Sequence, residues 1–412
     1  MSNKMKVKVI DSKMGTGKTS WAIQYMNEAD TSEKFIFITP FLNEVDRIKT
    51  SVTGREFIQP ESFKGKNKKQ HLKKLIAEGK DIVSTHALFK KADEALVELI
   101  EMEGYTLILD EVMNVIEQEH ISKDDLTMLR EYYMDIDEET GFCTWRDSNY
   151  EGRFLNIKRL AESGNLMVHN NTALYWTFPV EAFRAFHQVI CLTYMFDGQL
   201  QKYYYDMFNV EYFYKAIRRE GDRFKLVNYV NHEQEDRDQL RELINIHYSK
   251  LNDVGKNQFA FSSTRLEKWS TNKEYEQTKK KIKNNAYNFY RNKCQAPTEG
   301  VMWTTIKGDK DKIKNALAPA KAKKQFVEVT ARATNDYRHK FCCIYLANRF
   351  MNPMLKSFVE DKGAEVDQDK FALSEMLQWL FRSRIRENQP IDVYIPSSRM
   401  RKLLEMYLNN EM

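Results

Sequence analysis

The residues best suited to chemistry lie near the start of the chain, in the stretch VIDSKMGTGKTSWAIQYM. A short apolar strand is followed there by a glycine-containing turn and then by a helix. Glycines let successive backbone amides converge on phosphate oxygens, a lysine reaches the terminal phosphates, and the hydroxyl after it can hold Mg²⁺. The predicted nucleotide-binding residues are Met14, Gly15, Thr16, Gly17, Lys18, Thr19 and Ser20.

A second chemical element is TLILDEV, an apolar strand that ends on Asp110 and Glu111. One carboxylate can order the Mg²⁺ shell, and the other can orient and deprotonate an attacking water. Acidic strand ends are common, but the combination with Lys18 and Thr19 indicates hydrolysis of a nucleoside triphosphate, with ATP and Mg²⁺ as cofactors. We therefore expect Lys18, Asp110 and Glu111 to be catalytic. The predicted Mg²⁺ ligands are Thr19 and Asp110.

Apolar runs alternate with helical patterns around these motifs. Continuous apolar strands between helices are typical of a buried parallel sheet, so a doubly wound α/β unit is predicted. Its expected strands are 6–10, 35–39, 81–85, 106–110 and 189–196, and its expected helices are 19–28, 41–49, 69–78 and 91–101.

A second α/β unit is predicted to follow the first. Its expected strands are 223–230, 258–264, 301–306, 325–330, 341–346 and 391–396, with helices over 233–250, 370–385 and 397–409. The predicted division is therefore 1–205 and 206–412. An insert over about 118–187 is too long for an ordinary loop and must carry its own structure, for which a hairpin is expected. It could form a strand-separating pin or a platform for a partner protein.

Composition limits the class of protein. The chain has 412 residues and a net charge of +5, which permits a polyanionic partner without requiring one. Its five cysteines and eight histidines show no metal-binding spacing, so Mg²⁺ is the only metal expected. Scattered thiols, the charged start and the absence of a long apolar segment favour a cytoplasmic protein without a signal peptide or a membrane span.

The order of motifs resembles that of superfamily 2 helicases of the DEAD/DEAH-like group, in particular the compact forms of bacteriophages and other DNA viruses. FITPFLNEVDRI, VSTHALF, LILDEV and ICLTYMFD follow the phosphate loop as motifs Ia to III would. FAFSSTR, EVTARATNDYRH and MLQWLFRSRIRENQPI are similar to motifs IV, V and VI. The resemblance covers nearly the whole chain and implies two RecA-like lobes, with ATP bound between them.

The implied activity is ATP-driven movement along one nucleic-acid strand, with unwinding of duplex in phage replication or recombination. The implied partners are single-stranded or forked DNA, with RNA as an alternative, and replication proteins; the implied state is a monomer. By family position, the residues that touch the strand are Thr39, Pro40, Thr85, His86, Ser263, Thr264, Thr334 and Asn335. Small hydroxyl and amide groups suit phosphate contacts that do not read bases.

The resemblance also requires an arginine that offsets charge on the γ-phosphate. Residues four apart share a helix face, so on the predicted helix Arg382 and Arg386 could both point at the nucleotide, with Gln378 one turn earlier and Arg384 pointing elsewhere. Arg386 is the preferred arginine finger, followed by Arg382. The motif III position reads LTY, where Thr193 could bridge to Glu111. Because eleven residues precede Ser12, there is no room for an upstream glutamine motif, and loose nucleotide selection is expected.

Other segments leave alternatives open. Lysine-rich runs at 64–74, 278–283 and 307–324 could contact a strand electrostatically, although such runs are usually solvated faces. The aromatic run 202–214 fits internal packing better than base stacking. The alternative functions are the ATPase of a DNA-packaging terminase and an ATP-driven loader or translocase without unwinding. A terminase would carry a nuclease carboxylate cluster, for which only Asp361, Asp367 and Asp369 are candidates.

Overall fold

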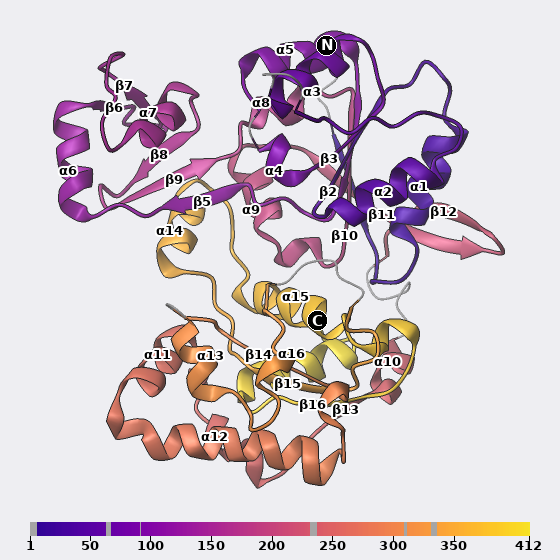
Figure 1. Ribbon diagram of the computed structural model, residues 1–412, viewed down its shortest axis with the longest axis vertical. Coiled ribbons are helices and arrows are strands. Elements are labelled where there is room, and N and C mark those ends of the chain that lie inside the picture. Colours follow the sequence, from indigo (N-terminus) through magenta and orange to yellow (C-terminus); the bar gives the residue numbers. More distant parts are fainter. Residues whose placement is uncertain (1–5, 63–66, 91, 231–236, 309–310, 331–335) are drawn as a thin grey trace. The chain divides into compact units, whose positions relative to one another are not determined.

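The computed structural model describes residues 6–62, 67–90, 92–230, 237–308, 311–330 and 336–412 (Figure 1). By its internal contacts the chain forms two compact units. The first contains the chain up to Asp11, together with Gly17–Asn228 and Asn352–Val366. The second contains Ser12–Thr16, Tyr229–Met351 and Asp367–Met412.

The first unit is built on a seven-stranded sheet with the order β12-β11-β1-β10-β4-β2-β3. The strands are β1 (Val7–Asp11), β2 (Phe35–Thr39), β3 (Ile82–Thr85), β4 (Thr106–Asp110), β10 (Gln188–Thr193), β11 (Tyr212–Glu220) and β12 (Arg223–Asn228). All neighbouring pairs are parallel except β11 and β12, and β2 is buried along its whole length. The predicted parallel α/β sheet is therefore confirmed.

Helices connect these strands as the sequence indicates. They are α1 (Lys18–Glu28), α2 (Leu42–Ser51), α3 (Lys68–Ala77), α4 (His86–Phe89), α5 (Glu94–Glu103), α8 (Val180–Arg184) and α9 (Leu200–Met207). Local signals set their ends: the Asp93 side chain accepts from the Leu96 amide at the start of α5, and Gly104 ends that helix with φ +67°. Both are standard helix termini, a capping carboxylate and a left-handed glycine.

One strand that was predicted for the second unit belongs to the first. The segment RFKLVN, predicted to open the second unit, is β12, and it pairs antiparallel with β11 at the edge of the first sheet. A tight turn at Gly221, with φ +62°, closes this hairpin. The first unit consequently continues to Asn228 instead of ending at residue 205. The aromatic run lies inside this unit, where Tyr203, Tyr204 and Tyr205 are completely buried.

The insert forms a small α/β body with its own apolar core. Its elements are β5 (Ile116–Glu119), α6 (Lys123–Tyr132), β6 (Met134–Ile136), β7 (Cys143–Trp145), α7 (Leu155–Glu162), β8 (Leu166–His169) and β9 (Ala173–Thr177). The strands form an antiparallel sheet, β5-β9-β8, and a separate β6–β7 hairpin. The insert is thus more than the expected hairpin, because α6 and α7 accompany its strands.

A helix from much later in the chain packs against this insert. It is α14 (Pro353–Asp361), drawn next to the insert in Figure 1. The Phe358 ring stacks on Tyr175 with centroids 4.3 Å apart, and Lys362 Nζ donates a hydrogen bond to the Thr140 carbonyl at 2.6 Å. The segment 352–366 is therefore part of the first unit, although the chain before and after it belongs to the second.

The second unit contains a four-stranded parallel sheet with the order β13-β16-β15-β14. The strands are β13 (Ile244–Ile246), β14 (Val301–Thr305), β15 (Cys342–Leu346) and β16 (Ile391–Tyr394). The helices are α10 (Arg237–Leu243), α11 (Ser263–Thr271), α12 (Glu276–Asn288), α13 (Lys312–Leu317), α15 (Gln368–Leu380) and α16 (Ser398–Leu408). Trp303 and Ile344 are completely buried at the centre of its core.

Three expectations for this unit are wrong. Residues 258–264 form a turn and the start of α11, because Phe261 adopts φ +64° to bury its ring and the Asn348 amide group holds the Gln258 and Ala260 carbonyls. Residues 325–330 make only an isolated bridge between Trp303 and Phe326. Within 233–250, the described helix covers Arg237–Leu243 and is followed directly by β13.

Candidate nucleotide-binding site

The phosphate loop joins β1 to α1 through two glycines in the left-handed region. Gly15 has φ +86° and Gly17 has φ +95°, conformations that side chains rarely adopt. The Thr16 amide and hydroxyl both donate to the Lys13 carbonyl, at 3.3 and 2.8 Å, and tighten the turn. Gly17 is the N-cap of α1 and offers no capping side chain. The first amides of α1 thus keep the geometry that binds anions at helix N-termini.

The structure brings the two predicted Mg²⁺ ligands together. The Thr19 hydroxyl donates to Asp110, with distances of 3.1 Å to Oδ1 and 3.3 Å to Oδ2. Lys18 is nearly buried, with 8% of its surface exposed. Burial, followed by the charges of Glu111 and Glu44, raises the pKa of Asp110 to about 7. Hydroxyl and carboxylate oxygens are hard ligands of the kind that Mg²⁺ prefers, so these residues fit the ion.

Glu111 directly follows β4 in an unusual backbone conformation. Its φ is +73°, a strained value for a residue with a side chain. The Glu111 amide donates to the Leu192 carbonyl of β10 at 3.0 Å, which holds the turn in place. The carboxylate is therefore carried on a fixed turn next to the Thr19–Asp110 pair.

The turn after β10 is held by polar residues outside the predicted site. Asp11, at the end of β1, accepts hydrogen bonds from the Met195 and Phe196 amides, both at 2.8 Å. Thr193 donates to Gln199 Oε1 at 2.8 Å, so its hydroxyl bonds that glutamine and not Glu111 in this structure. The signal for Asp11 was present, because a carboxylate ends an apolar strand just before the phosphate loop.

Gln201 is a second buried polar residue that was missed. It is completely buried in α9, and its Oε1 accepts from the Met113 amide at 2.7 Å. Its Nε2 donates to the Tyr205 hydroxyl, also at 2.7 Å. The bond to Met113 fixes the chain two residues beyond Glu111. No local pattern in the sequence distinguishes Gln201 from a surface glutamine.

The motif VI region does not form one continuous helix. Helix α15 carries Gln378 but ends at Leu380, where the Ser383 hydroxyl bonds the Leu380 carbonyl, and a 3₁₀ turn, η8 (Arg384–Glu387), follows. The expectation that Arg382 and Arg386 share an α-helical face is therefore wrong.

The motif VI arginines have different surroundings within the second unit. Arg384 bonds the Pro390 carbonyl and lies 4.5 Å from the centre of the Phe341 ring, whereas Arg382 is nearly buried. Residues 12–16 belong to this unit by their contacts. A Cβ atom placed on Gly15 would lie 3.4 Å from the Arg386 carbonyl oxygen and 3.7 Å from Arg386 Cγ. The backbone and the Cγ atom of Arg386 therefore lie close to Gly15.

The strand-contact candidates fall in three places. Thr39 and Thr85 are paired across β2 and β3, and Pro40 and His86 directly follow them. Thr39 is completely buried, and its hydroxyl has no hydrogen-bond partner among the described residues. Ser263 and Thr264 begin α11. Thr334 and Asn335 lie outside the described residues.

The candidate nuclease carboxylates are used in other ways. Asp367 caps α15, Asp369 pairs with Arg399 at 2.6 Å, and Asp361 lies 3.6 Å from His169 Nε2. Across the described part of the chain, no group of three or more His, Cys, Asp or Glu side chains could hold a metal ion. No helix in that part is long and apolar enough to cross a bilayer.

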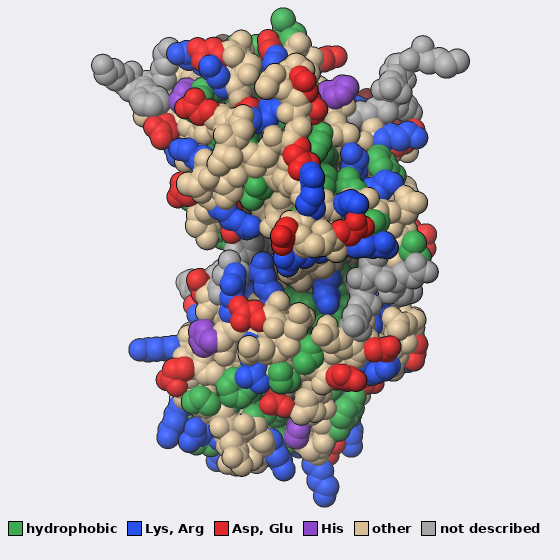
Figure 2. Space-filling model, turned by 90° about the vertical axis from the view of Figure 1, so that its right-hand side faces the viewer, with side chains coloured by type: hydrophobic (Ala, Val, Ile, Leu, Met, Phe, Trp, Pro, Cys, Tyr) green, Lys and Arg blue, Asp and Glu red, His purple; other side chains and the backbone are tan. Residues whose placement is uncertain are grey.

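Surface charge and cavities add little to the nucleotide site. Lys69 and Lys73, from one lysine-rich run, both pair with Asp93, and Figure 2 shows basic and acidic side chains interspersed on the face it presents.

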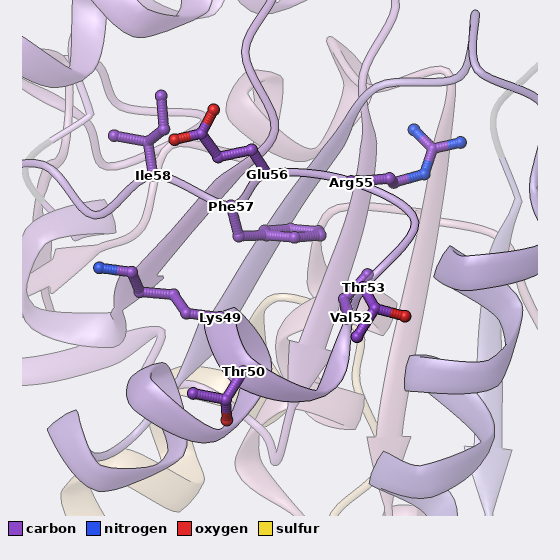
Figure 3. Close-up of a pocket in the computed structure, with 8 residues that line it drawn as sticks. All are labelled: Lys49, Thr50, Val52, Thr53, Arg55, Glu56, Phe57 and Ile58. Atoms are coloured by element: carbon purple, nitrogen blue, oxygen red, sulfur yellow. The ribbon is translucent and has the colours of Figure 1, made fainter.

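A cavity of about 450 Å³ lies beside the end of α2. Figure 3 shows its Arg55 side chain directed away from Lys49, and the guanidinium donates to carbonyls at the end of α1. This cavity is therefore part of the packing around α1.

Comparison with known proteins identifies the family. Residues 116–176 match the YonV middle domain, and residues 238–408 match the YonV C-terminal Rossmann-like domain. The chain is 44% identical over 418 residues to the SPbeta prophage-derived uncharacterized protein YonV of Bacillus subtilis (strain 168), covering 98% of this chain and 99% of that protein.

Solved structures provide a comparison of fold alone. The structure titled XPD_APO matches with a TM-score of 0.50 and 11% identity, over 98% of this chain and 95% of that one. The S. tokodaii Xpd4 structure gives a TM-score of 0.49 at 11% identity, over 99% of this chain and 94% of that one. The fold is thus helicase-like with Rossmann-like domains, and the chain belongs to the YonV family.

Proposed function

We propose that this protein is a nucleic-acid-dependent ATPase that moves along a single strand and separates duplex DNA. The observation that carries the proposal is the hydrogen bond between Thr19 and Asp110, next to a phosphate loop and to Glu111. A kinase of small molecules would not need the glutamate to activate water. The helicase-like fold supports movement on nucleic acid as the use of this hydrolysis.

Each residue has a defined part in the proposed reaction. The loop amides around Gly15 and Gly17 hold the phosphates, and Lys18 places its charge on the terminal ones. Thr19 and Asp110 would hold Mg²⁺, which supplies charge neutralisation at the phosphate oxygens when bound. Glu111 orients a water in line with the γ-phosphorus and accepts its proton. Arg386 is proposed to offset the charge that develops in the transition state.

Strand β10 is the proposed connection between hydrolysis and movement. It lies between β1 and β4, and the Leu192 carbonyl accepts the Glu111 amide. The turn that follows β10 is held by Asp11, immediately before the phosphate loop. If the turn at Glu111 changes when the γ-phosphate is lost, the change would therefore pass through β10 to the turn that Asp11 holds.

The proposed track on the first unit lies at the ends of β2 and β3. Thr85, Pro40 and His86 are partly exposed there, whereas Thr39, the β2 neighbour of Thr85, is buried and could contact a strand only through its backbone. Backbone amides and small side chains at such strand ends can hold phosphates without reading bases. Single-stranded or forked DNA is the proposed substrate, with RNA as the alternative that the assay below tests.

The charge of the insert favours a partner protein over a strand-separating pin. Residues 116–176 contain six Lys and Arg against twelve Asp and Glu, a net charge of −6. A surface of this sign repels nucleic-acid phosphates. We propose that the insert binds a protein with a basic surface, such as a replication partner.

The test is steady-state ATP hydrolysis by the purified protein with single-stranded DNA, single-stranded RNA, duplex DNA or no nucleic acid. Stimulation by one kind of single strand is expected and would identify the track. Lys18-dependent turnover that no nucleic acid stimulates would contradict a strand-driven motor and favour packaging or loading chemistry. A forked duplex, with displacement and translocation followed separately, then distinguishes unwinding from movement alone.

A further inference from the structure

An aromatic side chain of the β11–β12 hairpin lies against Gly17, where the phosphate loop meets α1. A Cβ atom placed on Gly17 would lie 2.2 Å from Phe224 Cε1 and 2.8 Å from Phe224 Cζ. The ring therefore lies directly against the Gly17 backbone, which requires a glycine for this reason as well as for its positive φ. Phe224 is only partly buried, so part of the ring surface stays accessible.

The hairpin is fixed to α1 by polar contacts at the same residue. The Phe224 amide donates to Gln24 Oε1 at 3.0 Å, and Gln24 Nε2 donates to the Phe224 carbonyl at 3.2 Å. One residue earlier, Arg223 forms an ion pair with Glu28 of the same helix. Figure 1 shows the hairpin running beside α1. The position of Phe224 relative to Gly17 is therefore set by two residues of α1, Gln24 and Glu28, that lie one helical turn apart.

The strand order gives the direction in which a nucleotide must lie. Asp110 is on β4, two positions from β1 on one side, whereas β11 and β12 lie on the other side of β1. The terminal phosphates belong near Lys18, Thr19 and Asp110. The ribose and base must then extend away from β4, toward the hairpin that carries Phe224.

We propose that Phe224, assisted by Arg219, is the contact face for the nucleobase of the bound nucleotide. The Arg219 guanidinium carbon lies 5.9 Å from the centre of the Phe224 ring, on the adjacent strand. Aromatic and guanidinium planes both stack on bases, and such stacking tolerates any base. The site would thus prefer nucleoside triphosphates to bare polyphosphate, without strict selection of adenine. This inference rests on the proposed ATPase function and adds the residues that recognise the nucleoside.

The experiment compares ATP with inorganic tripolyphosphate, both with Mg²⁺, in equilibrium binding to the full-length protein. Phe224→Leu keeps an apolar side chain against Gly17 but removes the aromatic face. We expect it to raise the Kd for ATP about 10-fold while the Kd for tripolyphosphate changes by less than about 2-fold. Phe224→Tyr should retain the affinity of the wild type for both ligands.

Leu226→Ala is the matched control, because Leu226 packs in the same apolar cluster two residues further along the strand. It should leave the ratio of the two Kd values unchanged. An unchanged Kd for ATP in Phe224→Leu would overturn the inference, and so would an equal loss for both ligands, since Phe224 would then only support the loop. Failure of the wild type to bind either ligand would overturn the proposed function itself.

Discussion

The Thr19 hydroxyl lies 3.1 Å from Asp110 Oδ1, although 91 residues separate the two in the chain. Thr19 is in the first turn of α1 and Asp110 ends β4, so the contact depends on β10 lying between β1 and β4. The carboxyl ends of parallel strands meet at one edge of the sheet, where ligands of open α/β sheets bind. The contact therefore places the hydroxyl and the carboxylate of the proposed Mg²⁺ site within reach of one ion.

Thr19→Ala should weaken the binding of Mg²⁺ and ATP together. The substitution removes the hydroxyl ligand and leaves the phosphate loop glycines in place. We expect the Mg²⁺ concentration for half-maximal hydrolysis to rise about 10-fold or more, in line with the loss of a hydrogen bond or ligand to a charged group. Thr19→Ser, which keeps the hydroxyl, should stay close to the wild type. Equal Mg²⁺ dependence of the two variants would contradict the assignment.

Glu111→Gln should separate binding from hydrolysis. The amide keeps the size of the side chain but cannot accept the proton of the attacking water. We expect ATP affinity within a few fold of the wild type and a turnover lower by about 100-fold or more, as for loss of a general base. Fluorescent-nucleotide binding and phosphate release measure the two effects. Wild-type turnover in this variant would show that another group activates the water.

Arg386→Ala should lower turnover and spare ATP binding. A transition-state arginine is worth about 1000-fold or more in rate. Arg384→Ala is the control, because Arg384 contacts Pro390 and Phe341 within its own unit and should affect stability more than rate. Single-turnover hydrolysis at saturating ATP distinguishes the two. If Arg384→Ala has the larger rate effect, the assignment of the finger is wrong.

The contact between the insert and α14 should loosen in mild acid. His169 is nearly buried against Ser357 and Asp361, with Lys362 nearby, and burial lowers its pKa in spite of the opposing charge of Asp361. Because the folded pKa is below the ordinary value of about 6.5, the unfolded chain binds the proton more readily. The contribution of His169 to stability is therefore complete above about pH 6.5 and is lost as pH falls below that value.

Thermal unfolding between pH 7.5 and 5 measures this effect, with His169→Gln as the comparison. The wild type should lose more stability across this range than the variant, which has no imidazole to protonate. Parallel pH profiles of the two proteins would show that other groups determine the acid sensitivity. His247, whose pKa is also lowered by burial, offers a second position for the same comparison.

The sequence predicts the first sheet well because its strands are short, apolar and separated by helices. Strand β2 and strand β4 have the expected ends at Thr39 and Asp110. Strand β12 was misplaced because an edge hairpin has the same alternating pattern as a strand that begins a new unit, and only its pairing with β11 distinguishes them. The strand predicted over 258–264 is absent for a different reason. The backbone conformation at Phe261 is imposed by burial of its ring and by the hydrogen bonds of Asn348.

The candidate site was predictable where a motif has a fixed local form and unpredictable where tertiary contacts decide. Lys18, Thr19 and Asp110 follow from the loop and strand-end patterns, and the structure places Thr19 against Asp110. The end of α15 at Leu380 was missed because no glycine or proline marks it; a bond from Ser383 does. Gln201 was missed because its role depends on a partner 88 residues away.

The most direct test of the central claim is Mg²⁺-dependent ATP hydrolysis by the wild type and by Lys18→Ala, measured by phosphate release from proteins purified in parallel. We predict turnover by the wild type that disappears on chelation of Mg²⁺ and falls at least about 10-fold in Lys18→Ala, as expected for the loss of a charged group from the phosphates. Matching thermal stability of the two proteins would exclude unfolding as the cause. Equal turnover by both proteins would contradict the proposed site.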